Sequence, residues 1–285
     1  MTRFTGGARV AGVLGRPIGH SLSPLIHNAW IEAAGIDAVY VPLSPAPGGL
    51  KGLFEACRGG LVAGFNVTVP FKAEAVAAVD AVTGRARRSG AANLILFAAD
   101  GSIAADSTDG AGLMAALAEQ APSFAARGAK TVVLGAGGGG RSAAAALLEA
   151  GAAEVRLVNR THERAAEVAA ALGERVHVVG WADAAAALEG AGLLINATTL
   201  GLVGGEPLAL DLAALPVDAV VLDMVYRPLQ TPLLAAAAAD GRVVVDGLAM
   251  LIGQARPSFE ALFGPQPPAA VDVRALAVAA LERAG

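Results

Sequence analysis

Residues 130–141 read KTVVLGAGGGGR and decide the fold class of this 285-residue chain. The first half is an apolar, β-branched run typical of a buried strand, and the alanine-rich segment behind it is typical of a helix. Gly135, Gly137 and Gly140 fit the spacing GxGxxG: the first allows a tight turn, the second admits a pyrophosphate, and the third lets helix and strand pack closely. The stretch predicts a dinucleotide site at a helix N-terminus. Its expected contacts are Gly135, Ala136, Gly137, Gly138, Gly139 and Gly140.

The end of the next expected strand indicates which dinucleotide binds. An NAD site usually has an Asp or Glu there, about 20 residues past the glycines, to bind the adenosine ribose. This chain has Asn159, Arg160 and Thr161 instead, with Arg164 following. A planar guanidinium can hold a phosphate through two hydrogen bonds. The segment therefore favours NADP as cofactor; the alternative is an ordinary solvated helix start, where arginine is common.

Outward from this unit, apolar runs alternate with helical segments. Repeated strand–helix units with nearly all-apolar strands predict a parallel sheet covered on both faces. The N-terminal block has a similar alternation, and Asp100-Gly101 between two strand-like runs predicts an antiparallel hairpin. We expect an α/β protein with domains at 1–111 and 112–246, the second a Rossmann-type doubly wound sheet, followed by C-terminal helices at 247–285.

Composition excludes several classes of protein. Hydrophobic residues make up 55% of the chain and charged residues 16%, which excludes a disordered chain. The net charge of −4, from 25 acidic and 21 basic residues, argues against nucleic acid or an anionic membrane as partner. Cys57 is the sole cysteine and the four histidines are scattered, so we expect no disulfide and no metal site. Without a signal peptide or an apolar run of ~20 residues, we expect a soluble cytoplasmic protein.

Read together, short strings along nearly the whole chain resemble the shikimate dehydrogenase family. Each is weak alone, but their order and spacing are specific. They are GHSLSP (19–24), NVTVPFK (66–72), GAAN (90–93), DSTDG (106–110), the glycine turn (135–141), NRT (159–161), NAT (196–198), DMVYRPLQTPL (223–233) and GLAMLIGQA (247–255).

The resemblance implies a catalytic pair, Lys72 and Asp109. Oxidising a secondary alcohol needs a hydride acceptor and a group that takes the hydroxyl proton, and a lysine beside a carboxylate suits the second task. The sequence does not decide which of the two is the formal base. We expect Lys72 in that role, with Asp109 orienting lysine and substrate.

The same resemblance implies the binding residues. A polyhydroxylated ring demands several polar contacts, because a buried polar group left unpaired costs ~1–3 kcal/mol. Ser23 also suits a helix N-cap, with Pro24 at the first helical position, so a structural role for it stays open. The expected substrate contacts are Ser21, Ser23, Asn66, Thr68, Asn93, Tyr226 and Gln254, and further cofactor contacts are Asn196, Thr198, Met224 and Gly247.

The implied activity is the NADP-dependent interconversion of 3-dehydroshikimate and shikimate, in the biosynthesis of chorismate and the aromatic amino acids. The first domain would hold substrate, the second cofactor, and the C-terminal helices would return to the first. The main alternative is a quinate/shikimate dehydrogenase that uses NAD or both cofactors. A methylene-tetrahydrofolate dehydrogenase and a dinucleotide-sensing protein are more distant alternatives. We expect a monomer or homodimer. Departures from the usual family pattern are Leu94, Ser107, Thr199 and Ala249.

Overall fold

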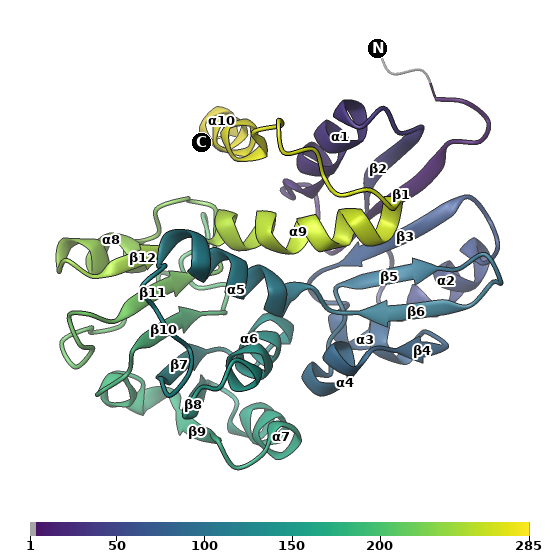
Figure 1. Cartoon of the computed structure of the whole chain (residues 1–285). Coiled ribbons are helices and arrows are strands. Elements are labelled where there is room, and N and C mark those ends of the chain that lie inside the picture. The colour runs from purple at the N-terminus through teal and green to yellow at the C-terminus, as the bar shows by residue number, and fades with distance from the viewer. Residues whose placement is uncertain (1–3, 285) are drawn as a thin grey trace. The chain divides into compact units, whose positions relative to one another are not determined.

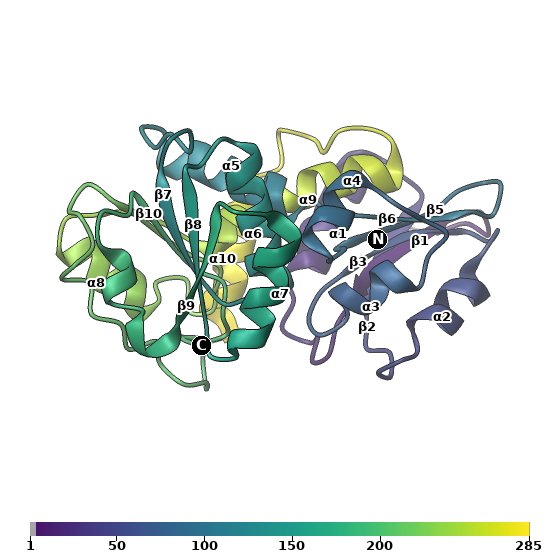
Figure 2. The same cartoon turned by 90° about the horizontal axis from the view of Figure 1, so that it is seen from below.

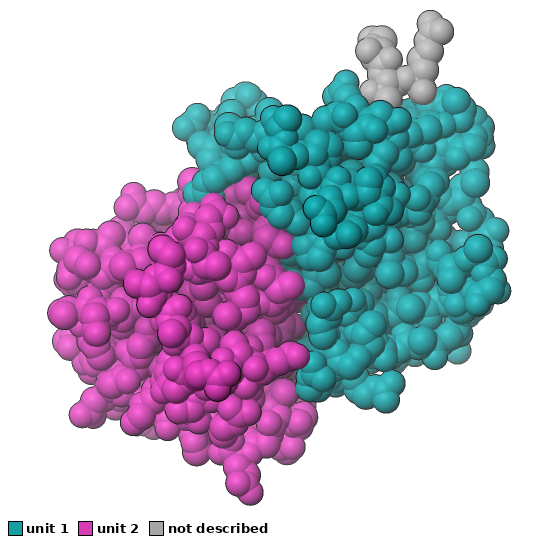
Figure 3. Space-filling view, viewed as in Figure 1, with its two compact units in different colours: residues 1–108, 254–284 teal, residues 109–253, 285 magenta. Residues whose placement is uncertain are grey.

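A computed structural model describes residues 4–284, which form two compact units (Figure 3). The first unit contains the chain up to Thr108 together with Gln254–Ala284, and the second contains Asp109–Gly253. Residues 1–3 and 285, which fall in the first and last predicted segments, lie outside the description. Each unit is built on its own sheet.

The described part of the first unit contains a mixed six-stranded sheet in the order β2-β1-β3-β5-β6-β4 (Figure 1). β1 pairs in parallel with both β2 and β3, whereas β5 runs antiparallel to β3 and β6. The hairpin predicted at Asp100-Gly101 is therefore present. The strands are β1 (Arg9–Leu14), β2 (Ala38–Leu43), β3 (Val62–Val67), β4 (Ala81–Val82), β5 (Leu94–Phe97) and β6 (Ile103–Asp106); the helices are α1 (Ser23–Ala33), α2 (Leu50–Cys57), α3 (Lys72–Ala77), α4 (Gly84–Ser89), the second part of α9 (Gly247–Phe263) and α10 (Val273–Ala284).

Helices cover both faces of this sheet. α2 and α3 lie side by side on one face (Figure 2), where Phe54 and Ala75 join a core cluster with Phe65 of β3. On the other face, Trp30 of α1 makes an edge contact with Phe259 of α9, and α10 packs against α1. The prediction that the C-terminal helices return to the first domain is confirmed.

The second unit contains, among the described residues, an all-parallel six-stranded sheet in the order β12-β11-β10-β7-β8-β9. Renumbered within the sheet, this is the 3-2-1-4-5-6 order of a dinucleotide-binding fold. The predicted Rossmann-type sheet is confirmed. Its elements are α5 (Asp109–Gln120), β7 (Lys130–Leu134), α6 (Gly138–Glu149), β8 (Glu154–Asn159), α7 (His162–Leu172), β9 (Val176–Gly180), the 3₁₀ turns η1 (Trp181–Asp183) and η2 (Ala186–Leu188), β10 (Leu193–Asn196), β11 (Val220–Asp223), α8 (Pro232–Ala239) and β12 (Val243–Val245).

Strand β7 is buried on both faces, which explains why Val132, Val133 and Leu134 are apolar in succession. Successive side chains point to opposite faces of a sheet. Val133 packs in the cluster formed with α5, α6 and α7, whereas Val132 and Leu134 pack in the cluster formed with the 3₁₀ turns and α8. Figure 2 shows α6 and α7 adjacent on one face. A strand buried on both sides needs apolar residues at every position, so its pattern does not alternate.

The helices within residues 4–284 are all too short or too polar to cross a lipid bilayer. Within the same range, the structure brings no three His, Cys, Asp or Glu side chains together in an arrangement that could hold a metal ion.

Candidate active site

Strand direction gathers the predicted substrate residues of the first unit at one edge of its sheet. β1 and β3 are parallel, so the loops that follow both strands leave at the same edge. β5 is antiparallel to β3, and Leu94 at its start pairs with Asn66 near the end of β3. Leu94 also pairs with Asp106 at the end of β6. The segments that carry Ser21, Asn66, Asn93 and Thr108 therefore begin or end side by side.

The loop after β1 carries the two predicted serines. The backbone N–H of Ser23 donates to Oγ of Ser21 at 3.3 Å, and Ser23 is 5% exposed. The N-cap alternative for Ser23 is wrong: Leu22 holds the N-cap position and Ser23 is the first residue of α1. The helix starts one residue earlier than predicted, and Pro24 is its second residue, still within the first turn that its fixed φ suits.

The loop after β3 places Thr68 and Lys72. The backbone N–H of Thr68 donates to Leu14 O at 2.8 Å, which fixes the loop to β1. Lys72 is the first residue of α3, and its carbonyl accepts from the N–H of Ala92 at 2.9 Å. Its side chain is half-buried. Backbone hydrogen bonds thus fix both ends of the segment from Thr68 to Lys72, which ends at the residue expected to transfer the proton.

A buried group of neutral side chains, the amide network, connects the remaining predicted residues of this unit. Nδ2 of Asn93 donates to Oε1 of Gln254 at 3.0 Å and to Oγ1 of Thr108 at 2.9 Å. The N–H of Thr108 donates back to Oδ1 of Asn93 at 2.7 Å. Asp109 follows directly, as the first residue of α5, and is 5% exposed. The network consists of Tyr40, Asn66, Asn93, Thr108, Gln254 and Ser258.

Sequence reasoning missed three members of the amide network. Thr108 lies inside the DSTDG string, and Ser258 is one helical turn after Gln254, so both could have been found from their neighbours. No local pattern singles out Tyr40, whose hydroxyl donates to Oδ1 of Asn66 at 2.8 Å. Burial raises the pKa of Tyr40 well above its ordinary value, so its hydroxyl keeps its proton.

The glycine turn of the second unit has the geometry that its spacing requires. Gly135 has φ +100°, in the region that favours glycine. A Cβ at Gly140 would lie 1.8 Å from Gly135 O, so the start of α6 can approach the end of β7 only without a side chain there. A Cβ at Gly137 would meet nothing within 4 Å, which leaves the turn open at the N-terminus of α6. This cradle fits a pyrophosphate.

The end of β8 carries the residues expected to read the adenosine ribose. Oδ1 of Asn159 accepts from Ala136 N–H at 3.1 Å, and its Nδ2 donates to Thr161 O at 2.7 Å, so Asn159 ties this end to the glycine turn. Arg160 and Arg164 are exposed. Arg160 lies 3.7 Å from the carboxylate of Glu206 in a solvent-exposed ion pair. Because such a pair is weak, a phosphate can replace Glu206 at little cost.

A second group, the Asp223 network, fixes the turn after β10. It consists of the buried Asn196, Asp223 and Thr231 and the half-buried Thr198. Asn196 donates to Asp223 at 2.9 Å and to Leu200 O at 3.0 Å, and it accepts from both the N–H and the hydroxyl of Thr198. These four bonds use the whole hydrogen-bonding capacity of the Asn196 amide. Asp223 also accepts from Thr231 and from Val225 N–H, and burial raises its pKa.

The remaining predicted residues of the second unit follow β11 and β12. A Cβ at Gly139 would lie 3.1 Å from Sδ of Met224, and one at Gly247 would lie 2.5 Å from Met224 O. Met224 thus lies beside the glycine turn and beside the start of α9. Tyr226, two residues further on, is half-buried. The structure therefore brings the predicted cofactor residues together at the carboxyl edge of the parallel sheet.

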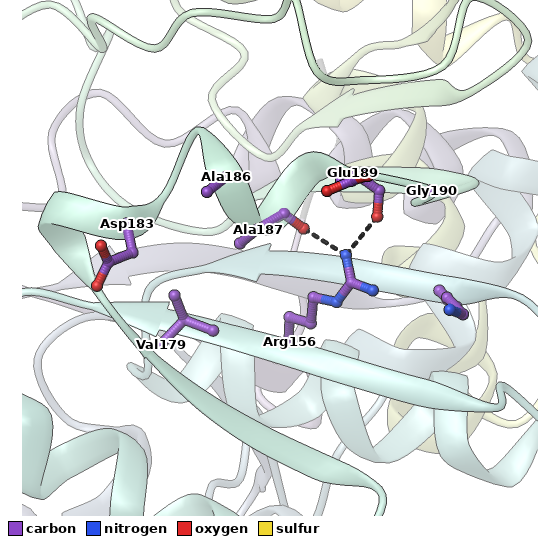
Figure 4. A pocket seen from close by; sticks show the side chains of 8 residues that line it. Arg156, Val179, Asp183, Ala186, Ala187, Glu189 and Gly190 are labelled. Carbon is purple, nitrogen blue, oxygen red and sulfur yellow. Dashed lines mark hydrogen bonds between the residues drawn. The ribbon is translucent and has the colours of Figure 1, made fainter.

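A separate hollow of about 560 Å³ opens on this unit (Figure 4). Its charged lining includes Lys130, Arg156, Asp183 and Glu189. Nη1 of Arg156 donates to Ala187 O at 2.7 Å and to Glu189 O at 2.6 Å, so its guanidinium holds the segment before β10. The hollow contains none of the predicted site residues.

Comparisons with known proteins identify the family of the chain. Residues 13–95 match the family described as shikimate dehydrogenase substrate binding domain, and residues 116–201 match shikimate / quinate 5-dehydrogenase. Shikimate dehydrogenase (NADP(+)) of Caulobacter vibrioides is 52% identical over 96% of both chains.

Solved structures are similar over almost the whole length. Shikimate 5-dehydrogenase of Thermus thermophilus in complex with NADP(H) and shikimate is 35% identical, with a TM-score of 0.82 over 97% of this chain and 100% of the other. Quinate dehydrogenase of Corynebacterium glutamicum in complex with NAD is 28% identical, with a TM-score of 0.85 over 96% of this chain and 99% of the other.

Proposed function

The chain belongs to the shikimate dehydrogenase family, and from this premise we propose that Lys72 and Asp109 act at the reacting hydroxyl in the NADP-dependent interconversion of shikimate and 3-dehydroshikimate. The observation that carries the proposal is that Ser21, Asn66 and Asn93 converge at one edge of the sheet. The loop from β3 to Lys72 leaves the sheet at the same edge. The chain is an oxidoreductase, as its sequence predicts.

NADP is the cofactor, and the residues of the second unit fit it. The glycine turn would hold the pyrophosphate at the N-terminus of α6. Arg160 and Arg164 would hold the 2′-phosphate, because guanidinium groups match phosphate oxygens in geometry and charge. We propose that Asn159 and Asn196 act mainly by shaping the turns that contact the cofactor, since their side-chain bonds are largely internal.

In the proposed mechanism, bound NADP⁺ supplies the hydride acceptor. In the oxidising direction, Nζ of Lys72 takes the proton of the reacting hydroxyl; in the reducing direction, its ammonium group returns a proton to the carbonyl oxygen. The carboxylate of Asp109 orients the lysine and the hydroxyl, and accepts hydrogen bonds from both. The half-buried position of Lys72 lets it exchange its proton with solvent between turnovers.

The substrate's other groups need partners of their own. We propose that Ser21, Ser23 and Tyr226 hold its carboxylate through hydroxyl and backbone donors. Thr68 and the amides of Asn66, Asn93 and Gln254 would hold its ring hydroxyls. Because the amides are already fixed by the amide network, the substrate meets oriented partners and loses less of its binding free energy to ordering them.

We propose that the first unit holds the substrate and the second holds the cofactor. The predicted division is at 1–111, 112–246 and 247–285, whereas the two units divide after Thr108 and after Gly253. We further propose a cytoplasmic location, which suits a chain whose single cysteine, Cys57, cannot form an internal disulfide. We propose a monomer or homodimer; light scattering of the purified protein tests this.

The test of function is the absorbance of the reduced nicotinamide. The purified protein receives shikimate or quinate, each with NADP⁺ or NAD⁺. We expect reduction with shikimate and NADP⁺ alone. Comparable rates with quinate or NAD⁺ would instead support a quinate/shikimate dehydrogenase, the alternative to which the similar quinate dehydrogenase structure and the second matched family point. No reduction in any mixture by a folded protein would refute the proposed activity.

A further inference from the structure

Within the amide network, the side chain of Asn66 has one allowed orientation. Its Nδ2 donates to Asn93 O at 3.0 Å and to Oγ of Ser258 at 3.0 Å. A carbonyl oxygen can only accept, so the nitrogen end of the amide must face Asn93. The oxygen end therefore faces the hydroxyl of Tyr40 at 2.8 Å, and Tyr40 must be the donor.

The three bonds leave Asn66 with a single unused hydrogen-bonding position. Both hydrogens of Nδ2 are donated, and one lone pair of Oδ1 accepts from Tyr40. The second lone pair of Oδ1 remains. A ligand group that meets this side chain must therefore be a donor, such as a hydroxyl, because a carbonyl oxygen there would be repelled.

Ser258 fixes the other end of the amide as firmly. Its hydroxyl hydrogen goes to Gln254 O, 3.0 Å away on the preceding turn of α9. Its oxygen can then only accept, which it does from Asn66, and the hydroxyl oxygen of Thr108 lies 3.1 Å away. Ser258 is completely buried. The loop after β6, the end of β3 and helix α9 are thus joined at one oxygen atom.

Packing fixes the side chain of Tyr40, and its backbone exchanges two hydrogen bonds with the side chain of Asn28, at 2.8 and 2.9 Å. Its ring is 1% exposed and stacks on the ring of His27, with centroids 4.2 Å apart and planes 3° apart. Phe259 and Trp30 enclose the same histidine. The position of the Tyr40 hydroxyl is therefore set by a rigid aromatic group, and the hydroxyl cannot follow Asn66 if the amide moves.

We propose that Tyr40 and Ser258 are positioning residues that hold Asn66 as an acceptor for a ring hydroxyl that does not react. The reacting position alternates between hydroxyl and carbonyl, and an acceptor would repel the carbonyl. Asn66 therefore belongs at a position that stays a hydroxyl throughout. This inference rests on the proposed function, because it needs shikimate as substrate.

A double-mutant cycle tests whether Tyr40 acts through Asn66. Initial rates with shikimate and NADP⁺ are measured for the wild type, Tyr40→Phe, Asn66→Ala and the double variant. Loss of one neutral hydrogen bond predicts a KM for shikimate raised ~3- to 10-fold by Tyr40→Phe, with kcat and the KM for NADP⁺ changed less than about twofold. In the Asn66→Ala background, Tyr40→Phe should change nothing further.

Ser258→Ala in the same cycle provides a second route, should Tyr40→Phe fold poorly. We expect the same rise in KM and the same loss of effect when Asn66 is alanine. Ser89→Ala is the matched control: Ser89 is also buried in the first unit, but its hydroxyl bonds only to backbone carbonyls of α4 and the following loop. Its KM for shikimate should equal that of the wild type.

The inference would be overturned if Tyr40→Phe and Ser258→Ala raised the KM for shikimate as much in the Asn66→Ala background as in the wild type. It would also be overturned if they raised the KM for NADP⁺ as much as the KM for shikimate, because such a result indicates a general structural role. These results require a wild type that oxidises shikimate. A folded wild type that does not would refute the proposed function and this inference with it, whereas an active wild type with independent effects refutes this inference alone.

Discussion

The two units hold their proposed binding residues with polar networks of different character. The amide network of the first unit contains only neutral amides and hydroxyls, each joined to another chain segment. The Asp223 network of the second unit is built around one carboxyl group, which accepts from Asn196, Thr231 and Val225 N–H. Both networks lie where strands end, so both position the loops that carry the proposed site residues.

The two networks differ in how they respond to pH and to the loss of one residue. A neutral network has donors and acceptors in fixed directions, so it can present a chosen polarity to a hydroxylated ring at any pH where its histidine neighbour stays neutral. A buried carboxyl group concentrates several bonds on one residue, and its loss leaves several donors unpaired at once. Damage to the first unit should therefore affect shikimate kinetics, and damage to the second should affect NADP kinetics and stability.

Lys72→Ala should have the largest effect on activity and should affect catalysis without affecting cofactor binding. Removal of a group that transfers a proton in the transition state lowers rates ~10²- to 10⁴-fold. We expect kcat to fall by that factor while the dissociation constant of NADP⁺, measured by fluorescence titration, is unchanged. Lys51→Ala is the control, since Lys51 is exposed on α2 of the same unit. Unchanged turnover would remove Lys72 from the mechanism.

Asp223→Ala should have the next largest effect, on the second unit alone. The change leaves three buried donors without their acceptor, at ~1–3 kcal/mol each, so we expect a loss of at least about 3 kcal/mol in the free energy of unfolding. The KM for NADP⁺ should rise with it, because the turn that carries Thr198 loses its support. The KM for shikimate at saturating NADP⁺ should not change.

Thr231→Ser is the matched control for that variant. It keeps both the hydroxyl that donates to Asp223 and the oxygen that caps α8 through Leu234 N–H. Stability and the KM for NADP⁺ should therefore stay close to wild type. A loss of stability in Asp223→Ala no larger than in Thr231→Ser would show that the carboxyl group is not the centre of the network.

Arg160→Ala tests the cofactor side without disturbing either network. Charge-assisted hydrogen bonds contribute ~1.5–3 kcal/mol, so we expect the KM for NADP⁺ to rise roughly 10- to 100-fold and the KM for NAD⁺ to change little. Arg127→Ala, at an exposed arginine of the same unit, should change neither. Equal losses for both cofactors would mean that Arg160 does not read the 2′-phosphate.

The sequence predicted the second unit better than the first. Its glycine turn and apolar strands obey local rules, and sheet order followed from the motif that they form. In the first unit, motif strings located Asn66, Asn93 and Gln254, but not how they are connected. Asn93 and Gln254 are 161 positions apart, and no periodicity links residues so distant in the chain.

Three features could not be read from local pattern, for physical reasons. The donor role of Tyr40 depends on which end of the Asn66 amide faces a backbone carbonyl, and only the fold determines that. The N-cap prediction for Ser23 failed because Pro24 fits anywhere in the first helical turn, so the local sequence does not decide between Leu22 and Ser23 as the N-cap. Asp223 resembles any aspartate at a strand end until its burial is known.

The smallest predicted effect concerns His27, which makes the stability of the first unit depend on pH. Neither of its ring nitrogens has a hydrogen-bond partner, and burial lowers its pKa to about 3. The unfolded chain takes up a proton below the ordinary pKa of 6.5 and the folded chain does not, so stability is lost as pH falls from 6.5 towards 3, by roughly 1.4 kcal/mol at pH 5.5. The raised pKa of Asp223 acts in the opposite sense, since it lowers stability as pH rises from the ordinary carboxyl range.

His27→Phe keeps a ring against Tyr40 but removes the titrating group. In a Trp181→Phe background, fluorescence of Trp30, the remaining tryptophan, reports unfolding of the first unit by urea. Between pH 7.5 and 5.5 we expect the variant to lose about 1.4 kcal/mol less stability than its parent. His177→Gln, at an exposed histidine of β9, should lose as much as the parent. If His27→Phe also loses as much as the parent, His27 is protonated in the folded chain at pH 5.5, and the first unit is not held by neutral groups alone.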